Sequence, residues 1–176
     1  PGCHLVAGDD IDVAVHSLKD LPTAPADGLQ MAAIPVREDS RDVLVGRTLD
    51  TLRDGDRIGT GSPRRALQLA ELAERLGLTL EIVEIRGNVG TRIGQAADGR
   101  VAAVVLAAAG LRRLGHLPTG PAPDGDDSIT AVRGLTAQVL SIDDMVPAPG
   151  QAALGLEIHE SLSEPAAAAV RTLDDH

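Results

Sequence analysis

One pattern restricts the fold of this chain more than any other: short aliphatic stretches alternate with helix start and stop signals through its middle part. Stretches rich in Val, Ile and Leu are typical of buried strands, and capping residues mark the helices between them. This order of strands and helices predicts an α/β domain with a largely parallel sheet and right-handed crossovers. The strands expected here cover residues 57–60, 79–85 and 101–107.

The two helices between these strands have end residues that set their limits. Ser62 is a typical N-cap, and Pro63 follows it at the first helical position, where its missing N–H is least costly. Gly77 is expected to end this helix. Asn88 is placed to cap a second helix that ends near Gly99. Both helices therefore begin in the turn that follows a strand.

Further elements are expected on both sides of this core. Residues 11–15 alternate as a strand and lead into the polar loop from His16 to Asp20, and polar side chains beyond a strand's end are well placed for a site. Thr119 to Ser128 is dense in Pro, Gly and Asp, which is typical of a surface loop. Ser163 starts a last helix that the end of the chain cuts short. The other strands are expected at residues 31–35, 42–45 and 152–158.

Composition excludes several classes of function. The chain has no Phe, Tyr or Trp, so its core is aliphatic and bases have no rings on which to stack. A net charge of −10 argues against a nucleic-acid partner, and a small ligand is expected instead. Cys3 is the lone cysteine, which predicts no disulfide, no metal site and a cytoplasmic setting. The apolar run 101–110 is short of the roughly 20 residues of a membrane-spanning helix.

Arginines gather at both helix starts. Arg64 and Arg65 lie in the first turn after Ser62, where the positive end of the helix dipole disfavours a cation. Arg86 precedes the second helix, and Arg92 lies in its first turns. An anion held by guanidinium groups and free backbone N–H groups would offset these charges. The alternative is a solvated surface, but the repetition favours a ligand with several negative groups.

Two other patterns allow more than one interpretation. Lys19 and Asp20 place a cation beside a carboxylate at a strand's end, which is either a site or a surface ion pair, and His16 is equally well a structural histidine. The segment 59–64 is only superficially similar to a dinucleotide fingerprint, because Arg64 replaces the third glycine and no P-loop ending follows. The residues alone therefore predict an anion-binding α/β domain.

Several segments, taken in order, resemble the porphobilinogen deaminase family. Val13 to Pro22 resembles the segment that bears the family's catalytic aspartate, and Arg86 to Arg92 is the most specific match. Pro147 to Ala153 resembles the return crossover between domains. The resemblance runs from Asp12 to Glu157, with an apparent insertion between His116 and Met145. The remaining matching segments are residues 37–42, 59–65 and 111–115.

The resemblance implies three α/β domains, of which the first two are similar to the lobes of type II periplasmic binding proteins with the active site in their cleft. One lobe would be nearly complete here and one partial. Residues 1–36 would end the first domain and carry the catalytic loop, and 37–146 would form the second, anion- and cofactor-binding domain. Residues 147–176 would cross back and begin the linker to the third. The chain is thus expected to be an internal fragment that lacks the amino-terminal part of domain one and all of domain three.

The resemblance also implies a transferase of tetrapyrrole biosynthesis, hydroxymethylbilane synthase, which condenses four porphobilinogen units and releases ammonia. Its dipyrromethane cofactor is a primer bound covalently to a cysteine of the third domain, which Cys3 does not match. The enzyme is expected to be a cytoplasmic monomer with neither a nucleic-acid nor a membrane partner. Without the third domain, this fragment is expected to be inactive.

By the same resemblance, Asp20 is the catalytic residue, which hydrogen-bonds pyrrole N–H groups and stabilises the developing cation. Gly61 replaces the family's usual serine and removes one hydroxyl contact. Two alternatives stay open: a non-enzymatic anion-binding module of the periplasmic-binding-protein type, and a degenerate truncated paralogue. The expected substrate-binding residues are Arg86, Arg92 and Arg113, and the expected cofactor-binding residues are Lys19, Ser62, Arg64, Arg65, Arg86 and Asn88.

Overall fold

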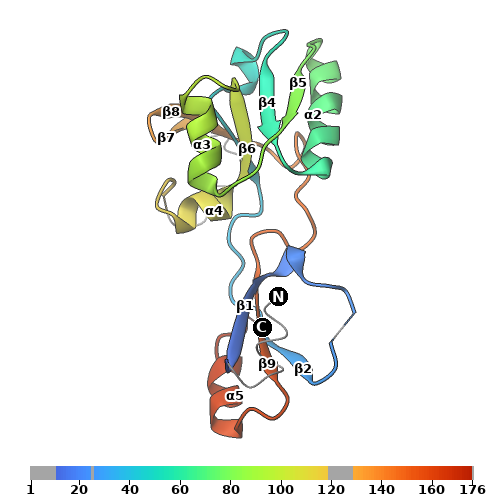
Figure 1. Cartoon of the computed structure of the whole chain (residues 1–176), viewed down its shortest axis with the longest axis vertical. Helices are drawn as coiled ribbons and strands as arrows, with labels where there is room; N and C mark the ends of the chain where they lie inside the picture. The colour runs from blue at the N-terminus through green and yellow to red at the C-terminus, as the bar shows by residue number, and fades with distance from the viewer. Residues whose placement is uncertain (1–10, 25, 119–128, 176) are drawn as a thin grey trace. The chain divides into compact units, whose positions relative to one another are not determined.

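The computed structural model describes residues 11–24, 26–118 and 129–175 of the chain, which divides into two compact units (Figure 1). Unit 1 combines Pro1–Glu38 with Pro149–His176, and unit 2 is Asp39–Ala148. Cys3 and the expected loop at 119–128 lie outside the described residues. Within the described part, no helix has both the length and the apolar character needed to cross a membrane.

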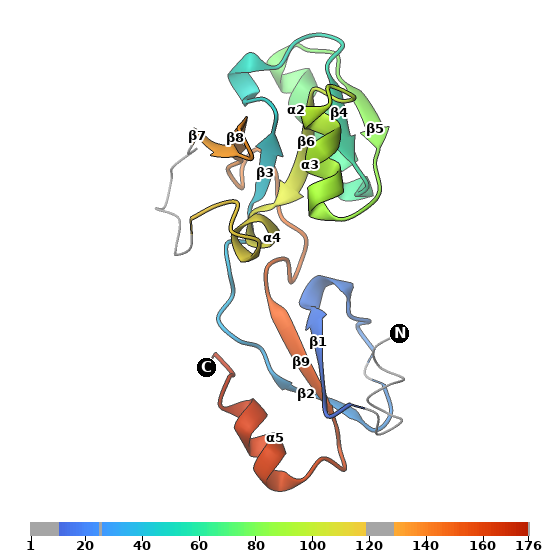
Figure 2. The same cartoon turned by 60° about the vertical axis from the view of Figure 1, so that its left-hand side comes forward.

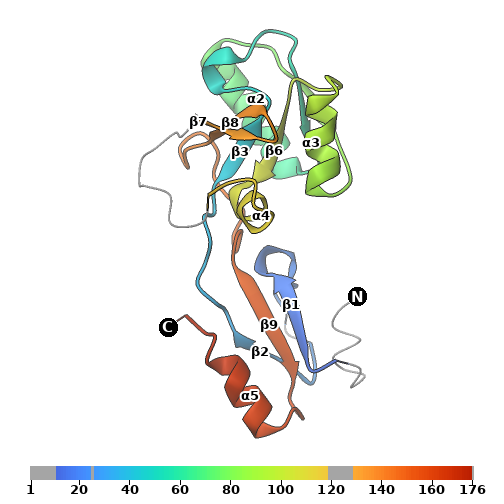
Figure 3. The ribbon, with the colours of Figure 1, turned by 90° about the vertical axis from the view of Figure 1, so that its left-hand side faces the viewer.

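Unit 1 is built on a three-stranded antiparallel sheet in the order β1-β9-β2. Its central strand β9 (Leu154–His159) pairs with β1 (Val13–Ser17) on one side and β2 (Leu29–Ala33) on the other, so segments far apart in the sequence form one sheet. A short 3-10 helix η1 (Leu18–Asp20) follows β1. Helix α5 (Glu164–Arg171) packs against β2 (Figure 3). This helix ends before the chain does, contrary to the expectation.

Unit 2 contains a six-stranded sheet in the order β5-β4-β6-β3-β8-β7. The short helix η2 (Leu49–Thr51) follows β3, and the longer helices follow β4, β5 and β6. The strands are β3 (Asp42–Val45), β4 (Arg57–Thr60), β5 (Glu81–Glu84), β6 (Ala103–Ala107), β7 (Ile129–Val132) and β8 (Leu135–Val139). The helices are α2 (Pro63–Leu76), α3 (Val89–Ala97) and α4 (Ala108–Arg113).

Helices α2 and α3 cover opposite faces of this sheet (Figure 2). Val43 and Val45 of β3 lie in the same core as Ile93 of α3, whereas Leu44 between them lies in the core with Leu69 of α2. Successive side chains of a strand point to opposite faces, so one buried strand supplies both cores. The sheet is therefore the middle of three layers, and its cores are aliphatic, as the composition predicts.

Only part of the sheet is parallel. β4 pairs in parallel with β5 and β6, as the strand and helix order predicts, but β3 is antiparallel to β6 and β8, and β7 is antiparallel to β8. The expectation of a largely parallel sheet is therefore wrong. The link from β3 to β4 contains only η2, so the chain reverses without a crossover helix. A tight turn joins β7 to β8 at Arg133 and Gly134, which have φ values of 52° and 81°.

The predicted limits of α2 and α3 are confirmed. The Ser62 side chain accepts a hydrogen bond from the Arg65 N–H, Pro63 is the first helical residue, and Gly77 ends α2 with a φ of 68°. The Asn88 side chain accepts from the backbone N–H of Thr91 at 2.8 Å at the start of α3. Both helices therefore place their first turns directly after strands β4 and β5.

Candidate functional site

The two arginines at the start of α2 share one buried carboxylate. Asp42, at the beginning of β3, is fully buried. Its Oδ2 accepts from Nη2 of Arg64 at 2.6 Å, and its Oδ1 accepts from Nη2 of Arg65 at 2.6 Å. Arg65 also donates to the carbonyl oxygen of Val105 at 3.2 Å, and Arg64 donates to that of Val146. The negative charge that offsets these arginines is therefore supplied by the protein itself.

Burial separates the roles of these two arginines. The Arg65 side chain is 7% exposed and the Arg64 side chain 22% exposed, so only Arg64 keeps appreciable surface. A buried guanidinium requires a paired anion, because an isolated charge in the interior is very unfavourable. Arg65 therefore serves the structure of the α2 start, and Arg64 lies where a ligand can reach it.

The arginines at the start of α3 differ in exposure, since Arg86 is exposed and Arg92 is half-buried. The Arg86 side chain is 88% exposed and donates from Nε and Nη2 to Glu84 Oε1 at 3.0 and 2.8 Å. Arg92 donates from Nε to the carbonyl oxygen of Gly87 at 2.8 Å. The Arg92 Nη2 atom is 4.0 Å from the position of a Cβ on Gly61. The starts of α2 and α3 therefore lie beside each other, with Arg92 between them.

Gly61 allows this close approach. A Cβ added at Gly61 would lie 2.7 Å from the carbonyl oxygen of Ile85, which is closer than real Cβ contacts. Any side chain at this position therefore requires a backbone shift at the end of β5. Backbone therefore packs against backbone at Gly61.

A second carboxylate holds the end of α4. Asp39 accepts from Arg41 through its backbone N–H at 2.9 Å and through Nη2 at 2.9 Å, and from Nη2 of Arg112 at 3.1 Å. Burial raises the pKa of Asp39, but the hydrogen bonds and charge of Arg41 and the charge of Arg112 outweigh it, so the pKa lies below its ordinary value. Arg112 is buried, whereas the predicted site residue Arg113 is exposed at the last position of α4.

Asp20 and Lys19 lie in unit 1, at the end of β1. Both are exposed residues of η1. The backbone N–H of Leu18 donates to the carbonyl oxygen of Ala153 at 3.0 Å, and a Cβ on Gly150 would lie 3.2 Å from the Lys19 nitrogen. The segment before β9 therefore packs against η1. Within the described residues, the Asp20 carboxylate makes no hydrogen bond or ion pair, so it is available to a ligand.

His16 has a structural partner. Its Nε2 lies 3.2 Å from Oε2 of Glu157 on the neighbouring strand β9. Both side chains are mostly buried, at 18% and 11% exposure. The interpretation of His16 as a hydrogen-bonded structural histidine is therefore supported.

Each unit carries part of the predicted residue set. Ser62, Asn88 and the arginines of unit 2 gather around the starts of α2 and α3 and the end of α4, and Lys19 and Asp20 lie in unit 1. Sequence reasoning missed the two acceptors of the arginines, Asp39 and Asp42. The sequence did contain a signal for Asp42, because this aspartate begins an otherwise aliphatic strand. A carboxylate buried there needs a cationic partner. Among the described residues, no cluster of His, Cys, Asp and Glu is arranged to hold a metal ion.

Sequence comparison finds close relatives of this chain. A sequence model of porphobilinogen deaminase, described as its dipyromethane cofactor binding domain, matches residues 4–166. Porphobilinogen deaminase 1 of Streptomyces coelicolor is 50% identical over 151 residues, which are 84% of this chain and 42% of the relative. Porphobilinogen deaminase of Nocardia farcinica is 44% identical over 175 residues, which are 97% of this chain and 44% of the relative. The chain thus spans less than half the length of these curated relatives.

Solved structures share its fold. A probable amino-acid ABC transporter extracellular-binding protein of Bacillus subtilis has a TM-score of 0.50 at 12% identity, over 97% of this chain and 67% of its own. CbnR, a LysR family transcriptional regulator, also has a TM-score of 0.50, at 13% identity, over 98% of this chain and 56% of its own. At these identities the likeness concerns the fold alone. The expected α/β fold of the type II periplasmic-binding-protein kind is confirmed.

Proposed function

The chain belongs to the porphobilinogen deaminase family, and from this premise we propose that it forms the catalytic and anion-binding part of a hydroxymethylbilane synthase. The observation that carries the proposal is the family match over residues 4–166, which includes Asp20 and both arginine-bearing helix starts. The family consists of transferases that act on porphobilinogen. The proposed reaction condenses four porphobilinogen units into a linear tetrapyrrole with release of ammonia.

The unused donors at the two helix starts fit a cofactor that bears carboxylates. Ser62 and Asn88 use their oxygens as caps and keep a hydroxyl hydrogen and an amide N–H for a ligand. The side chains of Arg64 and Arg86 retain exposed surface, at 22% and 88% exposure. The dipyrromethane cofactor would supply the acceptor carbon for the first porphobilinogen. We propose that Ser62, Arg64, Arg86 and Asn88 of unit 2 hold its acetate and propionate groups, while buried Arg65 binds the Asp42 carboxylate that also holds Arg64. Lys19 of unit 1 is proposed as a further cofactor-binding residue.

Arg86, Arg92 and Arg113 are proposed to hold the carboxylates of porphobilinogen. All three lie on unit 2, at the start of α3 or the end of α4. A guanidinium group binds a carboxylate through two parallel hydrogen bonds, which fixes orientation as well as affinity. Their role is therefore to position the substrate's reacting carbon.

Asp20 is proposed to stabilise the charge that develops on the substrate. When the carbon–nitrogen bond of the protonated aminomethyl group breaks, the electron pair leaves with ammonia and the positive charge moves to the methylene-pyrrole. An ionised carboxylate that accepts the pyrrole N–H stabilises this charge without rearranging. The exposure of Asp20 at the end of η1 supports this role, because its oxygens are not used elsewhere within the described residues.

The test of Asp20 is the Asp20→Asn variant in a complete deaminase that carries this chain. Loss of one preorganised electrostatic contact is expected to lower turnover about 10²- to 10³-fold while the fold and the bound cofactor remain. Asp27→Asn is the matched control, since Asp27 is another exposed aspartate of unit 1. If the Asp20→Asn enzyme keeps half of normal turnover, Asp20 has no catalytic role, and the non-enzymatic anion-binding module becomes the better interpretation.

The test of the arginines compares Arg86→Leu and Arg92→Leu with Arg100→Leu. Each charged hydrogen bond contributes about 1.5 to 3 kcal/mol, so either of the first two should weaken substrate or cofactor binding about tenfold or more. Arg100 is an exposed arginine beyond the end of α3, so its variant should behave like the wild type. Unchanged KM and unchanged cofactor occupancy in Arg86→Leu and Arg92→Leu would contradict the assignment.

A cytoplasmic location and a monomeric state are parts of the same proposal. The net charge of −10 supports the absence of a nucleic-acid partner, because the dense row of phosphates along a nucleic-acid backbone requires a basic surface. Size-exclusion chromatography with light scattering tests the monomer, and a dimer would contradict it.

A further inference from the structure

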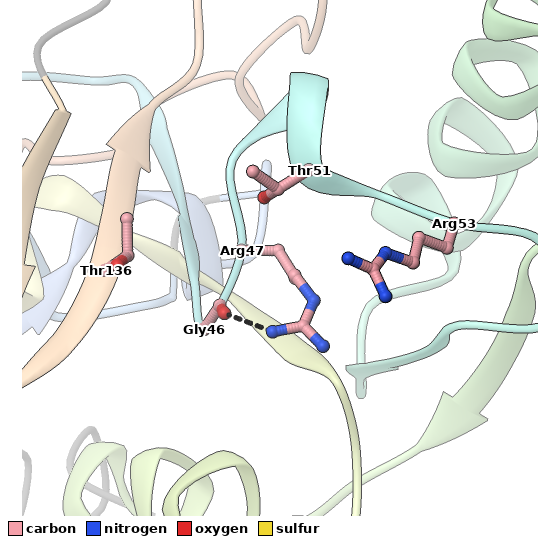
Figure 4. A pocket seen from close by; sticks show the side chains of 5 residues that line it. All are labelled: Gly46, Arg47, Thr51, Arg53 and Thr136. Atoms are coloured by element: carbon pink, nitrogen blue, oxygen red, sulfur yellow. Dashed lines mark hydrogen bonds between the residues drawn. The ribbon is translucent and has the colours of Figure 1, made fainter.

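Unit 2 contains a cavity at the end of its sheet that is opposite to the starts of α2 and α3. Two arginines line this cavity, and we propose that it binds the phosphate group of a small ligand. The cavity has a volume of about 270 Å³ (Figure 4). It is formed by the turn after β3, by η2 with the loop that follows it, and by β8. The residues that line it are Gly46, Arg47, Thr51, Arg53 and Thr136.

This cavity is separate from the helix starts discussed above. β3 runs antiparallel to β6, so Val45 near the cavity pairs with Val104 at the beginning of β6. β4 runs parallel to β6, and α2 starts only after the last residue of β4. The cavity therefore lies at the end of the sheet where β4 and β6 begin. The starts of α2 and α3 lie at the opposite end, where β4 and β6 finish. None of the residues proposed to bind porphobilinogen or the cofactor lines it.

Two guanidinium groups face the cavity. Figure 4 shows the side chains of Arg47 and Arg53 extending toward each other from opposite walls. Within the described part of the chain, the Arg53 guanidinium has neither a hydrogen-bond acceptor nor an ion-pair partner. Like charges across a small space repel each other, and an anion between them replaces that repulsion by attraction. The arrangement therefore favours an anionic ligand.

Arg47 has an unsatisfied donor. Its Nε atom is shielded from solvent and has no hydrogen-bond partner among the described residues, although Nη1 donates to the carbonyl oxygen of Gly46 at 3.4 Å. Oδ2 of Asp56 lies 3.7 Å from this Nε, which is an ion pair but too long for a hydrogen bond. Asp56 also accepts the backbone N–H of Arg53 at 3.0 Å. The residues that line the cavity thus carry two guanidinium groups and no carboxylate, and Asp56 beside them pairs with Arg47.

The walls of the cavity are fixed by the fold. The N–H of Gly46 donates to the carbonyl oxygen of Thr136 at 2.7 Å, which ties β3 to β8. Gly46 has a φ of 115°, and a Cβ there would lie 2.5 Å from the carbonyl oxygen of Ala102. The backbone N–H of Leu49 donates to the buried side chain of Gln138 at 2.7 Å. A ligand therefore meets a preformed site and does not have to order a loop.

The geometry favours a phosphate group over a carboxylate. The two oxygens of a carboxylate lie in one plane and are satisfied by a single guanidinium fork, whereas the oxygens of a phosphate point in several directions and accept from two forks on opposite sides. The Thr51 hydroxyl already donates to the carbonyl oxygen of Thr48 at 3.1 Å, so the arginines are the main donors. The ligand is therefore free phosphate or a small phosphomonoester.

The experiment is isothermal titration calorimetry of the 176-residue chain with inorganic phosphate, glycerol 3-phosphate and malonate. We expect saturable binding of inorganic phosphate or glycerol 3-phosphate and weaker binding of malonate. Whichever of the two phosphate compounds binds more tightly shows whether the ligand is free phosphate or a phosphomonoester. Arg47→Gln and Arg53→Gln should each weaken this binding about tenfold or more. Arg53→Gln is the decisive variant, because the Arg53 guanidinium has no partner among residues 11–24, 26–118 and 129–175 whose loss would disturb folding.

Two control variants make the result specific. Arg100→Gln removes an exposed arginine elsewhere on unit 2, and Arg92→Gln removes one at the proposed substrate site. Both should bind phosphate like the wild type, so failure of this proposal and failure of the porphobilinogen assignment remain distinguishable. Absence of phosphate binding, equal binding by Arg53→Gln, tighter binding of malonate, or an equal loss in either control would overturn the proposal.

Discussion

Replacing Asp42 by asparagine is expected to destabilise unit 2 strongly. The Asp42 carboxylate is fully buried and accepts hydrogen bonds at 2.6 Å from both Arg64 and Arg65. The asparagine amide keeps one acceptor oxygen but carries no charge and presents N–H groups to a guanidinium. Arg65, whose side chain is 7% exposed, would then hold a buried charge without an anion.

The expected cost follows from this geometry. Removal of one partner of a buried ion pair lowers the free energy of unfolding by about 3 to 5 kcal/mol. Because the asparagine oxygen can still accept a hydrogen bond, we expect Asp42→Asn to lower the free energy of unfolding by about 3 kcal/mol, the lower end of this range. For a unit of this size, such a loss lowers Tm by about 10 °C or more.

Far-ultraviolet circular dichroism in urea and in thermal scans measures this loss. The chain has no aromatic residue to report by fluorescence, and α2 and α3 place most of the helical signal in unit 2. Glu81→Gln is the matched control, because Glu81 pairs with Arg57 at 3.3 Å with side chains 61% and 49% exposed. An exposed pair contributes at most about 1 kcal/mol. If Asp42→Asn is no less stable than Glu81→Gln, the buried carboxylate does not hold the α2 start and the reasoning is refuted.

Three further predictions concern other parts of the chain. Because the pKa of Asp39 lies below its ordinary value of 3.8, its contribution to stability is complete above that pH and is lost as the pH falls through the lowered pKa. Urea unfolding from about pH 6 to about pH 2 should therefore show a shallower acid loss in Asp39→Asn, and equal slopes would contradict the pairing with Arg41 and Arg112. Gly46→Ala should lower Tm markedly, because it combines a φ of 115° with a Cβ placed 2.5 Å from the Ala102 carbonyl oxygen; an unchanged melting curve would show that the backbone relaxes freely. Under the proposed function, the 176 residues alone should form no tetrapyrrole from porphobilinogen, because the primer would need a tethering cysteine that the single cysteine, Cys3, does not match; product formation or a mass adduct on Cys3 would disprove this.

Local signals allowed a large part of unit 2 to be predicted. Ser62, Pro63 and Gly77 delimit α2 as expected, because caps act through hydrogen bonds within a few residues. The strands 42–45 and 57–60 were also placed correctly from their aliphatic residues. The hairpin β7–β8 was not predicted, since its turn at Arg133 and Gly134 stands beside a loop-like segment that dominated the pattern.

The candidate site shows the same difference between local features, which the sequence predicts, and contacts between distant residues, which it does not. The sequence alone was enough to predict site roles for the arginines at both helix starts and the aspartate after β1, because dipole position and motif order depend on neighbours in the chain, and these roles stay predictions. It did not identify Asp42 as the partner of Arg64 and Arg65, since 22 and 23 residues separate them along the chain.

What the sequence determined by itself is therefore local: the type of most elements between residues 42 and 107, the limits of α2 and α3, the aliphatic cores, and the family to which its motifs belong. What only the tertiary structure decided is non-local: the antiparallel pairing of β3, the distinction between buried Arg65 and accessible Arg86, and the cavity between Arg47 and Arg53. Propensities and caps depend on residues within one turn, whereas strand order, burial and charge pairing depend on which distant segments pack together.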